Sequence, residues 1–152
     1  MESALKETAA TPITTHEGIP QPRSEPRMLY DGFVPGQSLG SATYAVDAEA
    51  VAQWCRLFPD DDLGGLMPHG MIAVVSMRAY GEVIPRRPPG NIHAAQHFDL
   101  LRLPRIGEEL VTTVSCISKE IRRDRRRVTL ATETRGSTGP AFQGRMTVLW
   151  AA

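Results

Sequence analysis

The chain has 152 residues, of which 41% are hydrophobic and 22% charged, so it can bury one core of ordinary globular composition. Its 17 basic and 17 acidic residues cancel, which argues against a protein that works as a whole on nucleic acid or on a membrane surface. No segment is apolar for long enough to span a bilayer and the N-terminus has no signal pattern, so we expect a soluble protein of the cytoplasm. Cys55 and Cys116 show no metal-ligand spacing, and we expect both to be reduced and buried.

The first 27 residues differ from the rest of the chain. They are rich in proline and poor in large apolar side chains, and such a segment cannot bury enough surface to fold alone. We therefore expect residues 1–27 to form a tail or an extended arm, and residues 28–152 to form one globular domain.

The first elements of this domain are a short strand and a short helix. A strand is expected over residues 38–46, after the turn at Pro35 and Gly36. Asp47 is a suitable N-cap for the helix that follows. This helix has apolar residues at positions i, i+3, i+4 and i+7, which predict one buried face made of Val51, Trp54, Cys55 and Phe58. It ends at Pro59, before an acidic loop over residues 60–62.

Residues 69–84 predict the central element. The sequence HGMIAVVSMRAYGEVI has apolar side chains on every side of a helix and no charge before Arg78. A helix that is apolar all round is expected to be buried all round, and this one is too short to cross a membrane. It should form the centre of the core and end at Pro85.

After Gly90 the hydrophobic period changes from that of a helix to that of a strand. Residues 92–100 alternate, which places His93 and Gln96 on opposite faces. Strands are also expected over residues 110–121, 128–135 and 142–150, with a hairpin tip at 122–126. One buried helix followed by a long-stranded antiparallel meander is the order of an α+β hot-dog fold, in which the sheet curls around the helix.

Two motifs resemble the MaoC-like acyl dehydratase family, most closely its FAS1-type or MaoC N-terminal branch. The strand IHAAQHF at 92–98 and the turn RLPRIGE at 102–108 are similar to the family's His-x-x-Gln-x-Phe strand and Pro-x-x-Gly-Asp turn. Here the turn ends in Glu108. The sequence MPHGM at 67–71 resembles the family's entry to its central helix, and the resemblance extends from about residue 33 to residue 150.

This resemblance implies a hot-dog subunit that acts on acyl thioesters. Its first implication is an enoyl-thioester hydratase, which interconverts trans-2-enoyl and (R)-3-hydroxyacyl thioesters. Active members carry an Asp-x-x-x-x-His dyad before the central helix, whereas many members of the N-terminal branch lack the dyad and serve as partners of an active domain. Here the nearest pair, Asp62 and His69, is spaced more widely. The alternative is therefore a non-catalytic acyl-thioester-binding subunit that pairs with an active homologue.

Under the hydratase reading, three residues are catalytic candidates. His69 and Asp62 would handle the water and the α-proton, because imidazole is a suitable general base near neutral pH. The Gly70 N–H, at the positive end of the central helix, would polarise the thioester carbonyl. Met71 and Gln96 are candidates for contact with the substrate. No metal or redox cofactor is expected, because the thioester itself acidifies the α-carbon.

The hairpin tip supplies a second set of candidates. Five arginines crowd residues 122–127, and guanidinium groups bind phosphate in a bidentate manner. We expect Arg123 and Arg126 to contact the phosphates of coenzyme A or the acidic surface of an acyl carrier protein. An uncovered sheet edge also predicts a homodimer, or a heterodimer with a related hot-dog subunit.

A hot-dog thioesterase is a weaker alternative. That activity would need a carboxylate on the central helix near the substrate carbonyl. The only acid on the predicted helix is Glu82, which lies at its far end.

Overall fold

A computed structural model describes residues 26–151 of the chain. The predicted N-terminal arm lies outside these residues, apart from Pro26 and Arg27. The elements in chain order are η1 (Tyr30–Gly32), β1 (Ser38–Ala45), α1 (Ala48–Leu57), η2 (Pro59–Asp61), α2 (Met71–Val83), β2 (Ile92–Leu100), β3 (Glu109–Arg122), β4 (Arg125–Gly136) and β5 (Gly139–Trp150). The strands and helices predicted from the sequence are all present, with bounds that differ by a few residues.

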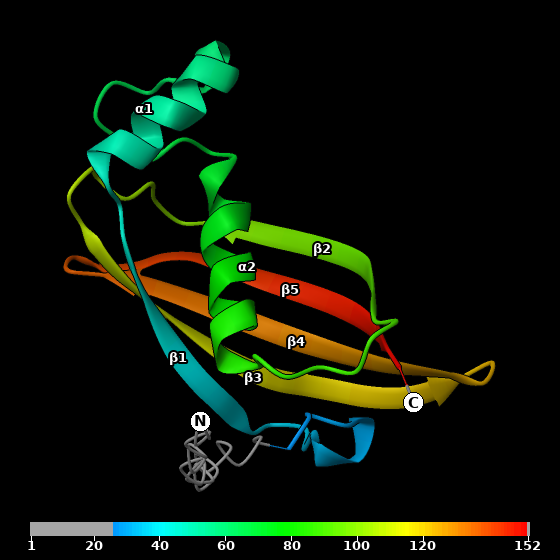
Figure 1. Ribbon diagram of the computed structural model, residues 1–152. Helices are drawn as coiled ribbons and strands as arrows, with labels where there is room; N and C mark the ends of the chain where they lie inside the picture. Colours follow the sequence, from blue (N-terminus) through cyan, green and yellow to red (C-terminus); the bar gives the residue numbers. More distant parts are fainter. Residues whose placement is uncertain (1–25, 152) are drawn as a thin grey trace, which may run out of the picture.

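The five strands form one antiparallel sheet in the order β1-β3-β4-β5-β2, and the sheet curls around α2 (Figure 1). Strands β3, β4 and β5 follow one another as a meander, and every second residue along most of their length is buried. This alternation gives the sheet a concave apolar face toward α2 and a convex face toward solvent. Strands β1 and β2 are the two edges.

The core between α2 and the sheet consists of two apolar clusters. One surrounds Trp150, whose ring meets that of Phe33 edge to face with centroids 4.7 Å apart. The other contains Phe142, Leu110 and Met71 and lies at the start of α2. The indole N–H of Trp150 donates to the Met28 carbonyl at 3.0 Å. This bond fastens the beginning of the described segment to the end of β5.

Helix α2 is not buried all round, which corrects the prediction. One face is buried, but Met77 is 37% exposed and Ala73 is also exposed. The helix packs chiefly on β1 and β3, so a single sheet covers only one side of it. Helix α2 therefore has more apolar surface than the sheet of one chain buries. No helix within residues 26–151 is long and apolar enough to cross a bilayer.

Helix α1 also buries less than its pattern predicted. Asp47 caps it as expected, since its carboxylate accepts from the Ala50 N–H at 3.0 Å. Only Val51 is fully buried, and Phe58 is 51% exposed because α1 lies beyond the end of the sheet (Figure 1). Both cysteines are free thiols, as predicted, but Cys55 on α1 is only half-buried.

Strand β2 contains a β-bulge that the alternation did not reveal. The register shifts between His93 and Ala95, so the pattern gains one residue there. As a result, His93 Nε2 lies 3.1 Å from Gln96 Oε1, and the two side chains share one face. Their predicted placement on opposite faces is wrong.

Strand β2 is also an unpaired edge of nine residues, none of them buried. Because such an edge and the uncovered apolar strip of α2 are both liabilities in a monomer, we expect a dimer. Light scattering at micromolar concentration should give the mass of two chains. The substitution Met77→Lys, on the uncovered strip, should shift the mass toward one chain. Val34→Lys, at an exposed position between η1 and β1, should leave the dimer unchanged. A monomeric mass for the unaltered protein would contradict the prediction.

Candidate functional site

The acidic loop returns to the start of α2 through a tight reversal. Asp62 accepts a hydrogen bond from the Gly64 N–H at 3.0 Å, which closes a local turn. Gly64 and Gly65 then adopt positive φ angles of 59° and 102°, which L-residues rarely adopt. This reversal brings His69 and Gly70 back to Asp61.

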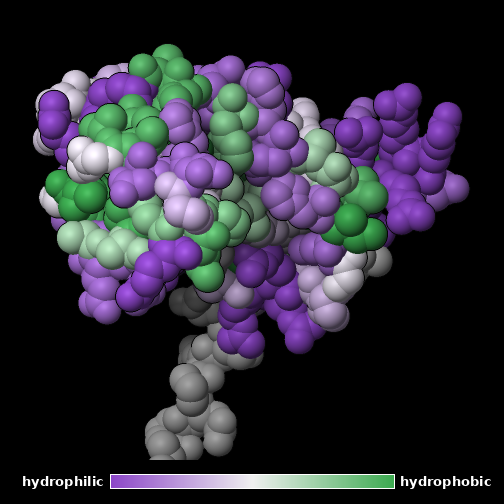
Figure 2. All heavy atoms as spheres, turned by 90° about the horizontal axis from the view of Figure 1, so that it is seen from above, coloured by the Kyte–Doolittle hydropathy of each residue, from purple (hydrophilic) through white to green (hydrophobic). Residues whose placement is uncertain are grey.

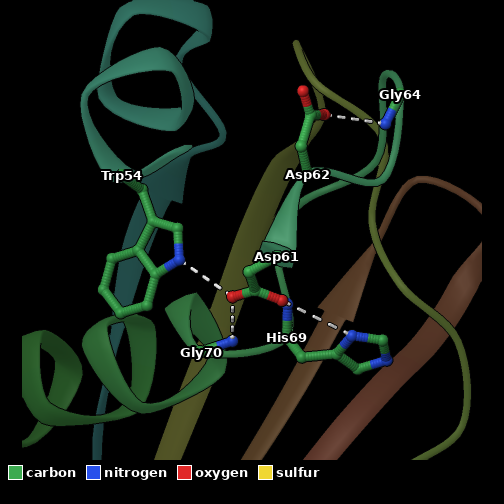
Figure 3. Close-up of polar contacts among 6 residues, drawn as sticks. All are labelled: Trp54, Asp61, Asp62, Gly64, His69 and Gly70. Carbon is green, nitrogen blue, oxygen red and sulfur yellow. Dashed lines mark hydrogen bonds and ion pairs between the residues drawn. The ribbon is translucent and has the colours of Figure 1, made fainter. Parts of the chain in front are cut away.

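Asp61 is the centre of the resulting polar cluster (Figure 3). One carboxylate oxygen, Oδ2, accepts from the indole Nε1 of Trp54 at 2.8 Å and from the Gly70 N–H at 3.0 Å. The other, Oδ1, accepts from the His69 N–H at 3.1 Å. Gly70 has no side chain to cap α2, so Asp61 satisfies these N–H groups from a distance of eight and nine residues in sequence.

The cluster keeps Asp61 ionised. Burial opposes ionisation, but hydrogen bonds from Gly70, Trp54 and His69 outweigh it, and the pKa of the carboxyl lies below its ordinary value. The negative charge also lies at the positive end of the α2 dipole. The start of α2 is thus an anion site that the chain fills with its own carboxylate.

His69 is the one candidate general base at this site. Its Nδ1 lies 3.7 Å from Asp61 Oδ1, and its side chain is 56% exposed. The ring is turned away from Trp54, as Figure 3 shows. A carboxylate beside an imidazole is an arrangement that general acid–base catalysis uses.

The structure brings together a different set of residues from the predicted one. The carboxylate beside His69 is that of Asp61, because the side chain of Asp62 is engaged by Gly64. The Gly70 N–H, predicted to face a substrate carbonyl, already donates to Asp61. Met71, predicted to contact substrate, is 3% exposed and belongs to the core.

Sequence reasoning also missed the role of Trp54. It was assigned to an apolar helix face, whereas its indole N–H holds Asp61 and its ring covers Gly70. A methyl group on Gly70 would lie only 2.2 Å from Trp54 Cζ2. The available signal was the need of a tryptophan N–H for an acceptor, with three acids six to eight residues further along the chain.

The remaining predicted residues lie on the sheet or its β3–β4 hairpin and have other partners. The Gln96 amide on β2 donates to the carbonyls of His97 and Arg145 at 3.3 Å. Arg123 in the β3–β4 turn and Arg126 at the start of β4 lie at the opposite end of the sheet (Figure 1). Twelve residues of β3 separate Arg122 from Leu110, which is about 40 Å at the rise of a strand. The chain therefore does not bring its arginine hairpin to its own His69.

The loop over residues 102–108, which contains the Pro-x-x-Gly-Glu turn, holds the segment that leads to His69. Met67 N–H donates to the Pro104 carbonyl at 2.8 Å, and Ile106 N–H donates to the Gly65 carbonyl at 3.0 Å. The last residue of the turn fixes this loop, because Glu108 accepts from Nη1 and Nη2 of Arg102 at 3.1 and 2.6 Å.

Glu108 also accepts from the Arg105 N–H at 3.1 Å, and Arg102 donates to the Gly139 carbonyl at 3.2 Å. The bonds from Arg102 outweigh burial and hold the pKa of Glu108 below its ordinary value. The turn motif of the sequence thus contains an ion pair, Arg102 with Glu108, that stabilises the loop behind the candidate site. Among residues 26–151, no three His, Cys, Asp or Glu side chains gather in a way that could hold a metal ion.

No protein-family model matches the chain. No curated protein matches it by sequence.

Solved structures, in contrast, match over most of the chain. The (R)-hydratase PhaJ1 from Pseudomonas aeruginosa superposes with a TM-score of 0.66 at 18% identity, over 82% of this chain and 86% of that one. The MaoC-like dehydratase from Rhodospirillum rubrum gives 0.68 at 19% identity, over 82% and 98%. The HadBC (3R-hydroxyacyl-ACP dehydratase) complex from Mycobacterium tuberculosis gives 0.58 at 14% identity, over 70% and 89%.

These likenesses define the class of the protein: it has the hot-dog fold, as the sequence predicted. The similar structures include a hydratase and a MaoC-like dehydratase, in agreement with the family resemblance of the strand and turn motifs.

Proposed function

We propose that this chain is a MaoC-like hot-dog subunit that binds acyl thioesters and works beside a catalytic hot-dog partner. The fold supports this proposal, since the chain is similar to hydratases and dehydratases and to HadBC, a complex of such subunits. The resemblance of the 92–98 strand and the 102–108 turn supports the same class of ligand.

The observation that carries the proposal is the carboxylate of Asp61 at the start of α2. Hydration of an enoyl thioester builds negative charge on the carbonyl oxygen, and unpaired N–H groups stabilise it. Here the N–H groups of His69 and Gly70 donate to Asp61 at 3.1 and 3.0 Å. A second anion at this position would be repelled. The wide spacing between the acidic loop and His69 favours the same conclusion.

The uncovered surfaces of the chain support the partner role. Strand β2 is an unpaired edge, and on α2 the apolar residues Ala73 and Met77 are exposed and Val74 is half-buried. Figure 2 shows hydrophobic residues at the surface in one part of the molecule, interspersed with hydrophilic ones. A related hot-dog subunit, or a second copy, would cover both surfaces.

A second candidate function is hydration by this chain alone. The contact of 3.7 Å between His69 Nδ1 and Asp61 Oδ1 favours it, because a carboxylate beside an imidazole supports a general base. In this reaction His69 would accept a proton from a water whose oxygen bonds to the β-carbon as the α,β double bond breaks, and the imidazolium would then return this proton to the α-carbon. Asp61 would have to release the Gly70 N–H to the thioester carbonyl.

The two functions are separated by mixing the purified protein with crotonyl-CoA and butyryl-CoA. We expect butyryl-CoA to bind in calorimetry and the enoyl absorbance of crotonyl-CoA to persist. We also expect His69→Ala to leave binding unchanged. The matched control is His97→Ala, which removes an exposed imidazole that also pairs with a carboxylate, Asp99 at 3.1 Å.

Turnover by the unaltered protein that falls about 10²–10⁴-fold in His69→Ala, and not in His97→Ala, would establish the second candidate instead. Absence of both binding and turnover would overturn the acyl-thioester assignment itself.

A further inference from the structure

The turn between β3 and β4 presents an unusual concentration of positive charge. Five of the six residues from 122 to 127, here called the arginine hairpin, are arginine, and the sixth is Asp124. Arg122 and Arg125 pair across the strands, and the two residues between them form the turn. In Figure 2 hydrophilic side chains project from the end of the molecule where Figure 1 places this hairpin.

The register sorts these arginines between the two faces of the sheet. Arg126 is in register with Trp150 and lies on the concave face, two residues before the buried Val128. Residues 122, 125 and 127 have the opposite phase and lie on the convex face. Together with Arg123 and Leu149 they line a hollow of about 560 Å³. The sequence predicted that Arg123 and Arg126 act together, but Arg126 lies on the other face. The hollow on the convex face is instead lined by four arginines, Arg122, Arg123, Arg125 and Arg127.

The charge of this set is poorly balanced within the described part of the chain. Arg122 and Arg125 stand directly opposite each other, an arrangement that destabilises a strand pair. Arg127 has a carboxylate partner in Glu120, at 3.6 Å. An anion placed between the guanidinium groups would relieve the repulsion.

The turn itself is strained. Arg123 and Asp124 have φ angles of 50° and 60°, so both central residues are left-handed, as in a type I′ turn. Such turns favour Asn-Gly, and arginine at this position costs conformational energy. The turn places Arg123 beside the hollow, and backbone strain of this kind accumulates at functional sites.

We propose that the convex face of the arginine hairpin binds the phosphate groups of a diphosphate-bearing ligand. Four guanidinium groups around one open hollow offer paired N–H donors to several phosphate oxygens. The site lies about 40 Å along β3 from the cluster at the start of α2. It is therefore separate from the site of the proposed function, and it is testable with ligands that have no acyl group.

The test titrates inorganic diphosphate, coenzyme A and adenosine into the full chain at low salt. We expect diphosphate and coenzyme A to bind and adenosine not to bind. In the double variant Arg122→Gln/Arg125→Gln, diphosphate affinity should fall at least about tenfold, because two charge-assisted contacts are lost. The dependence of the affinity on salt should also weaken.

The matched control is Arg135→Gln/Arg145→Gln. It removes the same charge from exposed positions near the opposite half of the convex face. Coenzyme A that binds more tightly than diphosphate would identify a nucleotide-type ligand, and equal affinities would identify diphosphate itself.

Three results would overturn the proposal: no diphosphate binding by the unaltered chain, an equal loss in the control variant, or tighter binding of a DNA duplex than of diphosphate. A second variant guards against misfolding. Asparagine accepts left-handed φ angles more readily than arginine, so Arg123→Asn should raise the unfolding temperature. It should nevertheless weaken diphosphate binding, and a purely structural role for Arg123 would not produce these opposite effects.

Discussion

The substitution Gly70→Ala is expected to lower the free energy of unfolding by about 3 kcal/mol, at the upper end of the cost of overpacking. The added methyl group would lie 2.2 Å from Trp54 Cζ2 and 3.2 Å from Asp61 Oδ2. The indole must therefore move, and its hydrogen bond to Asp61 would be lost with the movement. Urea unfolding measures the change, and the near-ultraviolet circular dichroism of tryptophan reports the displaced ring.

Gly81→Ala is the matched control, because the same substitution is made on the same helix. Nothing lies within 4 Å of a methyl group at Gly81. Alanine has the higher helix propensity, so this variant should gain about 0.5–1 kcal/mol. If Gly70→Ala were as stable as Gly81→Ala, the close packing of Trp54 on Gly70 would be refuted.

The second large effect on stability is expected at the Arg102–Glu108 ion pair behind the site. Glu108→Gln should cost about 3 kcal/mol at neutral pH, because it leaves the guanidinium of Arg102 without its charge partner. The Glu108 and Arg102 side chains are only 8% and 27% exposed, so water replaces the lost contact poorly. Glu109→Gln, at the exposed neighbouring position, should change stability by less than about 0.5 kcal/mol.

The cost of Glu108→Gln should depend on pH in a defined direction. The pKa of Glu108 is lower in the folded protein than its ordinary value, so the folded state binds this proton less tightly than the unfolded state does. The stabilisation is therefore fully present above pH of about 4.3 and is lost as the pH falls through the folded pKa. Urea unfolding at decreasing pH should show the two proteins converging. A difference that stays constant into strong acid would refute the role of the ion pair.

Local signals in the sequence were sufficient to predict the helices and strands. Alternation placed the strands, and Asp47 capped α1 as predicted, because capping and strand pleating depend on residues a few positions apart. The order of a buried helix and a meander then predicted the hot-dog fold, which the similar structures confirm.

The tertiary structure decided which carboxylate accepts hydrogen bonds from the N–H groups at the start of α2. Asp60, Asp61 and Asp62 are equivalent in sequence, and only the reversal at Gly64 and Gly65 directs Asp61 to the N–H groups of Gly70 and His69. The same long-range packing assigned Trp54 to this cluster.

The tertiary structure also decided which apolar side chains of α2 remain exposed. The composition of α2 records how apolar the helix is, but the curvature of one sheet sets how much of it is buried, so Met77 is exposed in a single chain. One added residue in β2 likewise put His93 and Gln96 on the same face, because a strand has a period of two and an insertion of one residue inverts the phase beyond it. Periodicity thus determined which elements form, whereas register, bulges and loop closure determined which side chains meet.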